Sequence, residues 1–317
     1  MRILVGAVGT GTAFGIITRL RMIWGNTIRL VGTDINPRHL VTSSIFLDEF
    51  FQVSNSDSVE FTYEISRLIS EKKIDMYIPI LNEEIVIAGQ LSEIDSFTKT
   101  SFWSSDLYGK CTNKEFANNL LRDAKVPIPY TLTKNEDINK FDEWFAKPRN
   151  GYGSHGARKF SASDIKTSGD AFINEMVVQE ICGAPEITVD SFFDYRNSFS
   201  RAYCRERLEV KSGVCTKANL FTDVALSEIA IKIGETINQL GAISFQVMKR
   251  GEDWVVTDLN LRTGAGTSMT CSAGFDVINA TYAARSNAEY MDFIPELPVG
   301  HSIVLTRQYT DFVMARK

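Results

Sequence analysis

Short apolar runs alternate with stretches of helical periodicity through the first 105 residues. The apolar runs predict strands at residues 2–8, 27–33 and 75–80, and the periodic stretches predict helices at 12–24, 59–72 and 83–91. Strands that alternate with helices usually form a parallel sheet with helices on both faces. We therefore expect an α/β, doubly wound, Rossmann-like domain at residues 1–105.

The pattern changes after residue 105. A helix is predicted at 113–124, before a break at Val126-Pro127-Ile128-Pro129, and this second region extends to about residue 180. From residue 181 onward longer strands are predicted, at 186–193, 199–207, 242–249 and 254–259, with helices at 224–240 and 275–288. This mixture indicates α+β packing, divided into regions 106–180 and 181–317.

Composition narrows the class of protein. The chain has 317 residues, 44% of them hydrophobic and 23% charged, and a net charge of −5, which gives no electrostatic footprint for nucleic acid. Its five cysteines form no CxxC pair, and its three histidines lie far apart, so a zinc cage or a disulfide framework is not expected. No run of about 18 apolar residues predicts a membrane span. We expect a cytoplasmic protein.

Polar side chains alternate at the end of the strand predicted at 254–259. Asp258, Asn260 and Arg262 share one face because alternate strand residues point the same way, and Gln246 lies on the preceding apolar run. Oxygen ligands of this kind suit Mg²⁺, and a guanidinium suits phosphate. The same pattern also fits a hairpin with a solvated polar face.

A glycine-rich segment joins two short predicted strands in the second region. The first strand ends at Lys147-Pro148, and the segment contains Gly151, Gly153, Ser154 and Gly156. Glycines let backbone N–H groups approach phosphates closely, and Lys147 would add a positive charge. A flexible, solvated hairpin is the alternative interpretation.

Two further segments suggest nucleotide contacts. The Gln179-Glu180-Ile181-Cys182 linker offers backbone groups to an adenine edge, and Glu186 could hold ribose hydroxyls. Near the N-terminus, Gly9, Gly11 and Gly15 follow the first strand and Asp34 ends the second, a variant of a dinucleotide-binding fingerprint. An NAD(P)-linked oxidoreductase is therefore an alternative function.

Taken in order, these segments resemble the ATP-grasp superfamily, most closely the carbamoyl-phosphate synthase large-subunit type and related carboxylate–amine ligases. The resemblance covers nearly the whole chain and makes residues 1–105 a pre-ATP-grasp domain. It implies that Lys114 and Lys147 bind the nucleotide phosphates, that residues 179–182 and Glu186 bind adenosine, and that Arg262 contacts the γ-phosphate. It assigns Mg²⁺, with Mn²⁺ as a substitute, to Gln246, Asp258 and Asn260. Two residues depart from the family pattern: Asp258 stands where Glu is usual, and Leu261 where Pro is usual.

The resemblance implies an ATP-dependent ligase that activates a carboxylate as an acylphosphate and joins it to an amine. Relatives often carry a basic residue near the acylphosphate, which makes Arg205 or Arg207 a candidate carboxylate clamp; surface ion pairs with Glu206 and Glu209 are the alternative. Glu83 and Glu84 could hold an amine or cap the following helix. Small-molecule substrates and a homodimer are compatible with the sequence, and so is ATP binding with little turnover.

Overall fold

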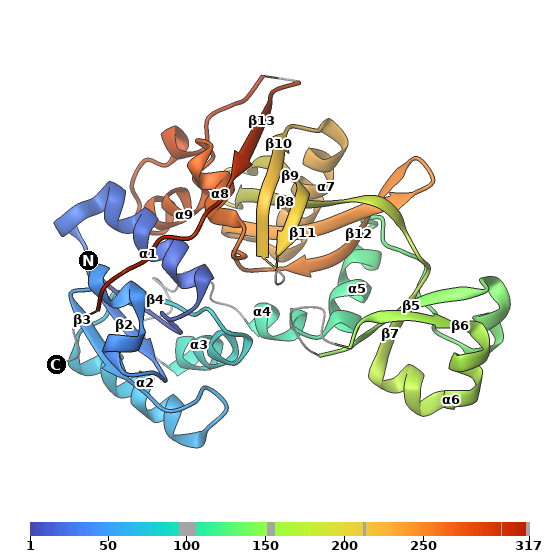
Figure 1. The fold of residues 1–317 in the computed structure, drawn as a ribbon, viewed down its shortest axis with the longest axis horizontal. Coiled ribbons are helices and arrows are strands. Elements are labelled where there is room, and N and C mark those ends of the chain that lie inside the picture. The colour runs from blue at the N-terminus through green and yellow to red at the C-terminus, as the bar shows by residue number, and fades with distance from the viewer. Residues whose placement is uncertain (95–105, 151–155, 212–213, 299, 315–317) are drawn as a thin grey trace.

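The computed structural model describes residues 1–94, 106–150, 156–211, 214–298 and 300–314, whose strands form three sheets (Figure 1). The first is a four-stranded parallel sheet in the order β3-β2-β1-β4. Its strands are β1 (Arg2–Val5), β2 (Arg29–Asp34), β3 (Glu49–Gln52) and β4 (Met76–Ile78). The connecting helices are α1 (Gly11–Trp24), α2 (Val59–Glu71) and α3 (Asn82–Ile94).

Helices cover both faces of this sheet because its strands are apolar on both sides. Ile3 and Val5 of β1 pack into a core with residues of α1, whereas Leu4 packs into a second core with residues of α2 and α3. The predicted doubly wound α/β domain is therefore confirmed.

The second sheet is small and antiparallel, in the order β6-β5-β7. This part of the chain contains α4 (Asp106–Cys111), α5 (Lys114–Asp123), β5 (Glu143–Pro148), β6 (Arg158–Ser161), α6 (Ala162–Glu175) and β7 (Met176–Gln179). Its own apolar core is centred on Trp144 and Ile165. In Figure 1 the sheet and α6 lie at one end of the molecule, in green.

The third sheet is antiparallel, with six strands in the order β12-β11-β8-β9-β10-β13. These are β8 (Gly183–Asp194), β9 (Phe199–Lys211), β10 (Val214–Phe221), β11 (Leu240–Arg250), β12 (Asp253–Asn260) and β13 (Ser302–Thr306). The helices here are α7 (Val224–Ile237), α8 (Thr267–Ser272) and α9 (Val277–Arg285). Each of the three sheets falls within one of the three predicted ranges, whose boundaries stay predictions.

The two faces of the six-stranded sheet differ in chemistry. Val189 of β8 pairs with Cys204 of β9 on one side and with Phe245 of β11 on the other. All three side chains belong to the main apolar core, which also contains residues of α7 and α9. Because side chains alternate along each strand, the residues between them point to the opposite face. That opposite face carries the polar residues.

Several elements were not predicted, and local irregularities explain two of them. β10 contains register shifts around Lys217, which break the alternation that identifies a strand. α6 is interrupted at Gly169, where φ is 68°, and buries only Ile165. β3, α8 and β13 are short, with at most six residues each. Among the described residues, no helix is long and apolar enough to cross a membrane.

Candidate nucleotide and metal site

A row of polar side chains crosses the six-stranded sheet. Asp258 of β12 is the register partner of Gln246 of β11. Gln246 in turn pairs with Thr188 of β8, and Thr188 pairs with Arg205 of β9. Direct cross-strand partners have Cβ atoms about 5 Å apart on one face. The prediction that Gln246 and Asp258 lie on paired strands of one hairpin is therefore confirmed, and two further polar residues extend their row.

A second row lies two residues along each strand. Asn260 pairs with Ser244, and Ser244 pairs with Asp190. The Asn260 amide Nδ2 donates to Asp258 Oδ2 at 2.9 Å, which joins the two rows at the β12 edge. The alternation that the sequence indicated thus brings the side chains of Asp258 and Asn260 into direct contact.

Lys147 reaches this face from β5 of the small sheet. Its Nζ donates to the Thr257 carbonyl oxygen at 2.5 Å and lies 3.8 Å from Asp258 Oδ1. The side chain is only 9% exposed, and desolvation lowers the pKa of its ammonium, while the charge of Asp258 acts in the opposite direction. The structure therefore brings together the predicted phosphate lysine and the predicted metal ligand.

Lys114 and Arg262 approach the same place. Lys114 is the first residue of α5, and its charge is one of the groups that lower the pKa of Lys147. Arg262 follows β12; desolvation lowers its pKa, and the charges of Asp258 and Glu83 raise it. Lys147 and Arg262 thus lie near Asp258, and Lys114 lies near Lys147, an arrangement of positive charge that suits a ligand with several negative charges.

The glycine-rich segment is described only in part. Gly151, Gly153 and Ser154 lie outside the described residues. Gly156 is exposed with φ of 75°, and a Cβ there would stand 3.0 Å from Pro148 Cγ. A left-handed backbone beside the Lys147-Pro148 strand end explains the glycine at this position.

The linker between β7 and β8 is held from one side by Tyr130. Glu180 N–H donates to the Tyr130 carbonyl oxygen at 2.9 Å, and Glu180 Oε1 accepts from Tyr130 N–H at 2.7 Å. The buried Gln179 side chain donates to Thr131 Oγ1 at 3.3 Å. Ile181 is 37% exposed and Cys182 is half-buried. Gln179 and the Glu180 carboxylate thus have protein partners.

A recess of about 590 Å³ adjoins this linker and is lined by Glu180, Ile181 and the β11–β12 turn at residues 249–252. Its volume is within the range of small-molecule pockets. Lys147 and Asp258 do not line it. The recess and the polar rows are therefore separate features.

Among the polar atoms of this face that are buried without a partner in the described part of the chain are Thr188 Oγ1 and Arg207 Nε. Arg207 Nη1 lies 3.3 Å from Glu186 Oε1, so both predicted ligand-binding residues form an ion pair with each other. The pairing with Glu206 or Glu209 that the sequence left open is not the one observed for Arg207. Buried polar atoms normally find hydrogen-bond partners, and a bound polar ligand would supply them.

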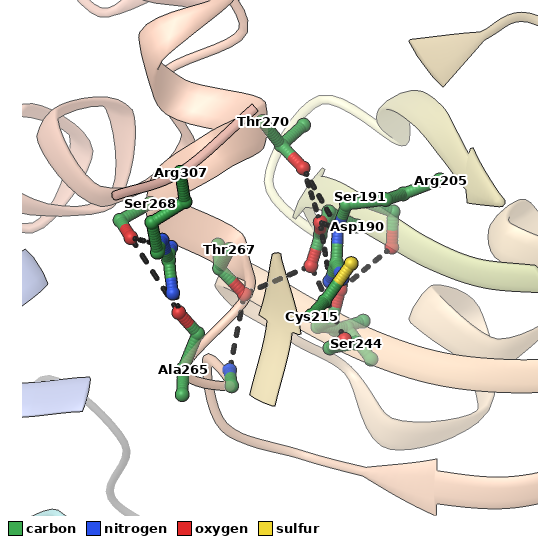
Figure 2. Close-up of polar contacts among 12 residues, drawn as sticks. Asp190, Ser191, Arg205, Cys215, Ser244, Ala265, Thr267, Ser268, Thr270 and Arg307 are labelled. Carbon is green, nitrogen blue, oxygen red and sulfur yellow. Dashed lines mark hydrogen bonds and ion pairs between the residues drawn. The ribbon is translucent and has the colours of Figure 1, made fainter. Parts of the chain in front are cut away.

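Arg205 belongs to a buried cluster centred on Asp190 (Figure 2). Its Nη2 lies 3.2 Å from Asp190 Oδ2, and Thr270 Oγ1 donates to the same oxygen at 2.6 Å. Ser244 and Thr267 donate to Asp190 Oδ1 at 3.2 and 2.9 Å. The hydrogen bonds from Thr267 and Thr270 to Asp190 connect α8 to the sheet. Gly266 leaves room for the Arg205 side chain, since a Cβ on residue 266 would stand 2.3 Å from Arg205 Nη1.

Arg307 holds the other side of the same loop. Its Nη2 donates to the Ala265 carbonyl oxygen at 3.1 Å and to Ser268 Oγ at 2.8 Å (Figure 2). The segment that directly follows Arg262 is therefore fixed by two arginines, neither of which the sequence pattern had placed there.

The N-terminal glycine turn has contacts that explain its pattern. Gly9 N–H donates to Asp34 Oδ2 at 2.6 Å, and a Cβ on Gly15 would stand 2.9 Å from Ser268 Cβ of α8. The glycine spacing thus serves a closed turn and a tight helix contact, without requiring a dinucleotide.

The donor set fits Mg²⁺ better than a softer metal. Within the described ranges no three His, Cys, Asp or Glu side chains gather as a metal cage. Asp258, Gln246 and Asn260 offer one carboxylate and two amide oxygens, and Mg²⁺ takes few protein oxygens and leaves other positions to phosphate and water. The orphaned Thr188 hydroxyl one strand away suits an oxygen-rich ligand beside the metal.

Comparisons with known proteins agree with this fold. Residues 111–266 match the family model described as an ATP-grasp domain. No curated protein matches the sequence. Among solved structures, N5-carboxyaminoimidazole ribonucleotide synthetase from Thermotoga maritima aligns with a TM-score of 0.70 at 15% identity, over 96% of this chain and 79% of that one.

Two other structures show the same fold. The biotin carboxylase domain of 2-oxoglutarate carboxylase from Hydrogenobacter thermophilus, crystallised with MgADP, ADP and bicarbonate, has a TM-score of 0.69 at 13% identity over 92% of this chain and 72% of that one. Phosphoribosylglycinamide synthetase from Anaerococcus prevotii has a TM-score of 0.65 at 13% identity over 90% and 75%. The α/β domain followed by antiparallel sheets is thus shared with these proteins.

Proposed function

Because the chain is an ATP-grasp domain protein, we propose that it is an ATP- and Mg²⁺-dependent ligase that activates a carboxylate as an acylphosphate and joins it to an amine. ADP and phosphate would be released. The observation that carries the proposal is the convergence of Lys147 and Arg262 on the Asp258–Gln246 pair. The carbamoyl-phosphate synthase-like branch of the family is part of the proposal.

In this proposal each polar element has a separate task. Lys114, Lys147 and Arg262 bind phosphate oxygens, while Gln246, Asp258 and Asn260 hold Mg²⁺ or Mn²⁺. Bound Mg²⁺ neutralises negative charge on the β- and γ-phosphates. The β7–β8 linker, from Gln179 to Cys182, faces the adenine, and Glu186 the ribose. Gly151, Gly153, Ser154 and Gly156 would supply backbone and hydroxyl donors to the phosphates.

The reaction needs no side-chain nucleophile. A substrate carboxylate oxygen attacks the γ-phosphorus, the bond to the bridging oxygen breaks, and ADP leaves. The amine nitrogen then attacks the acyl carbon, the bond from that carbon to the phosphate oxygen breaks, and the nitrogen releases a proton to solvent. The protein contributes positions and positive charge rather than covalent steps.

The carboxylate clamp stays a proposal for Arg205 and Arg207. Arg205 is engaged by Asp190 and Thr270, so its contribution would be to hold the loop after Arg262. Arg207 pairs with Glu186 and keeps an orphaned Nε, which makes it the better candidate for direct contact.

ATP binding without turnover is the second candidate function. Asp258 contacts both Lys147 and Asn260, and it is shorter than the glutamate that the family usually carries. Such a carboxylate, drawn toward protein partners, could hold ATP and Mg²⁺ without transferring the phosphoryl group. ATP binding with no ADP formed across a broad substrate panel would favour this candidate over ligation.

The test is a phosphate-release screen of carboxylates against amines, with Asp258→Asn beside the wild type. We expect ADP formation to fall by about 100-fold or more in Asp258→Asn, as when one charge-stabilising group is lost. Asp253→Asn, at the exposed start of the same strand, is the matched control and should keep full activity. Undiminished ADP formation in Asp258→Asn would contradict the metal assignment, and binding of NADH but not ATP would overturn the ligase.

A further inference from the structure

One hydroxyl group on the polar face of the six-stranded sheet is buried without a hydrogen bond. Thr188 of β8 is 4% exposed, and its Oγ1 has no partner among the described residues. Arg207 Nε, on the neighbouring strand β9, is buried without a partner as well. Both groups can donate a proton, and neither donates to the other. Because buried polar groups normally have partners, two neighbouring exceptions indicate that a ligand completes this face.

The other small hydroxyl groups nearby are already engaged. Ser244 and Thr267 donate to Asp190 Oδ1, and Thr270 donates to Asp190 Oδ2. Arg205, the register partner of Thr188 on β9, also bonds to this cluster. The cluster around Asp190 is therefore complete within the fold and makes no use of the Thr188 hydroxyl.

Threonine at position 188 is an unfavourable choice for packing alone. Valine has nearly the same shape, and strands favour it. A buried hydroxyl without a partner costs stability, because it gives up its hydrogen bonds to water and gains none in the fold. Residues that break a local rule in this way are characteristic of functional sites. The Thr188 hydroxyl therefore serves a purpose other than packing.

The surroundings of Thr188 suit an anionic ligand. Asp258 lies two strands away in the same row, and Lys147 and Arg262 are near it. Arg207 lies diagonally across from Thr188 on β9. Neighbouring strands are about 4.8 Å apart, so roughly 10 Å separate the backbone of Thr188 from that of Asp258. A polyphosphate can bridge this distance, and its oxygens accept protons from hydroxyl groups.

The order of residues along β8 matches the order of groups in an adenine nucleotide. The linker from Gln179 to Cys182, proposed to face adenine, leads into β8, and Glu186, proposed for the ribose, comes next. Thr188 follows two residues later, about 7 Å further along the strand. The phosphates likewise follow the ribose in the nucleotide. Thr188 is therefore placed beside the phosphates of a nucleotide bound in this direction.

The side chains that flank Thr188 can move. Glu186 and Arg207 form an ion pair at 3.3 Å, and their side chains are 41% and 28% exposed. Because exposed ion pairs contribute little to stability, opening this pair costs little. A nucleotide whose ribose binds Glu186 would separate the pair and open a path to Thr188.

We propose that the Thr188 hydroxyl donates a hydrogen bond to a phosphate oxygen of the bound adenine nucleotide. The residue binds and positions the phosphates; it forms no covalent bond and transfers no proton. This proposal rests on the proposed function, and it adds to the nucleotide site a residue that the family resemblance did not assign.

Calorimetry with MgADP and the full chain tests the proposal. Thr188→Val removes the hydroxyl and keeps the shape, so MgADP should bind about tenfold or more weakly, as expected for loss of a hydrogen bond to a charged group. Thr188→Ser retains a hydroxyl and should bind MgADP within about threefold of the wild type. Adenosine has no phosphate and should bind equally to Thr188→Val and the wild type, as followed by saturation-transfer NMR.

Urea unfolding separates this role from a structural one. Thr188→Val should unfold at the same urea concentration as the wild type or at a higher one, because it removes a buried hydroxyl that has no partner. Thr281→Val is the matched control, since the fully buried Thr281 Oγ1 accepts from Ala242 N–H at 2.8 Å and donates to the Val277 carbonyl oxygen at 2.6 Å. That variant should unfold at a lower urea concentration and bind MgADP like the wild type.

Unchanged MgADP affinity in Thr188→Val would overturn the proposal. An equal loss of adenosine affinity, or a loss of stability like that of Thr281→Val, would overturn it as well. The proposed function can fail separately. If the wild type binds no MgADP, the nucleotide site falls and the Thr188 assignment falls with it. If Thr188→Val binds MgADP more weakly and no carboxylate and amine yield ADP, the Thr188 assignment stands and the ligase function falls.

Discussion

At the scale of single residues, the buried charges of this protein differ in how completely they are paired. Asp190 is 1% exposed and Arg205 is 2% exposed, and Ser244, Thr267 and Thr270 complete the hydrogen bonds of their ion pair. Glu84 accepts hydrogen bonds from two backbone N–H groups, and among the described residues it forms no ion pair. A buried charge without a partner is unfavourable, so its pKa shifts until the neutral form is populated.

Glu84 should therefore make the protein less stable as the pH rises. Its pKa is 4.5 when exposed and about 7 in the fold, so between these values the unfolded chain has lost the proton that the folded chain keeps. The stability present below about pH 4.5 is lost as the pH rises to 7, by up to about 3 kcal/mol at roughly 1.4 kcal/mol per pKa unit.

We predict that Glu84→Gln removes this loss. Measured by urea unfolding, its free energy of unfolding relative to the wild type should rise by about 2–3 kcal/mol between pH 5 and pH 8. Glu60→Gln, at an exposed position of α2, should follow the wild-type pH profile. Parallel profiles for Glu84→Gln and the wild type would show that Glu84 ionises normally in the fold. A buried acid that destabilises the fold is a pattern associated with function.

At the scale of elements, the start of α5 places the lysine that the family resemblance assigns to the nucleotide. The Asn113 side chain accepts from the N–H groups of Glu115 and Phe116, both at 3.0 Å, and so caps the helix at the residue before Lys114. Lys114 N–H also donates to the Arg149 carbonyl oxygen at 2.8 Å, which ties the helix end to the end of β5. The cap therefore fixes the backbone position from which the Lys114 side chain extends.

We predict that Asn113→Ala destabilises the protein by about 1 kcal/mol, as expected for loss of an N-cap, and also weakens ATP binding. Asp223→Ala is the matched control, because Asp223 caps α7 through Leu226 N–H at 2.9 Å, away from the proposed phosphate contacts. It should lose similar stability and keep its affinity for ATP. Equal ATP affinity in both variants, measured by calorimetry, would contradict the assignment of Lys114 to the nucleotide site.

At the scale of the whole molecule, the apolar core is not divided as the three sheets are. One continuous cluster joins Ile3 of the parallel sheet to Phe193 and Phe245 of the six-stranded sheet. The small sheet has a separate core around Trp144 and Val178. Arg19 of α1 also contacts Asp276, just before α9, at 2.5 Å, which adds a buried polar link between the two large parts.

We predict that the small sheet opens more readily than the rest. By native-state hydrogen exchange, amides of β5, the central strand of the small sheet, should exchange about tenfold faster or more than those of β8 in the six-stranded sheet, because a smaller core gives a lower opening free energy. Amides of β1 should exchange on the timescale of β8, since both strands contribute to the same core. Equal protection in β5 and β8 would contradict a separate unit.

The particular elements show where sequence reasoning succeeds. The α/β alternation of the first region, the β11–β12 hairpin and the pairing of Gln246 with Asp258 could be predicted because they depend on local periodicity and nearby partners. β10 could not, because a bulge at Lys217 interrupts its alternation. Nothing local to Asp190 indicates that residues 54 to 80 positions away will complete its hydrogen bonds.

The sequence by itself determined the order of the elements, the two strands that carry the polar motif and the face on which that motif lies, since these follow from side-chain direction along a strand. Only the tertiary structure decided which strands stand beside that hairpin, and therefore that Thr188 and Arg205 continue its polar row. It also decided that Lys147 reaches Asp258 from another sheet, and that the Glu84 side chain is buried away from water. The physical reason is that charge pairing and burial depend on neighbours in space, which chain order does not specify.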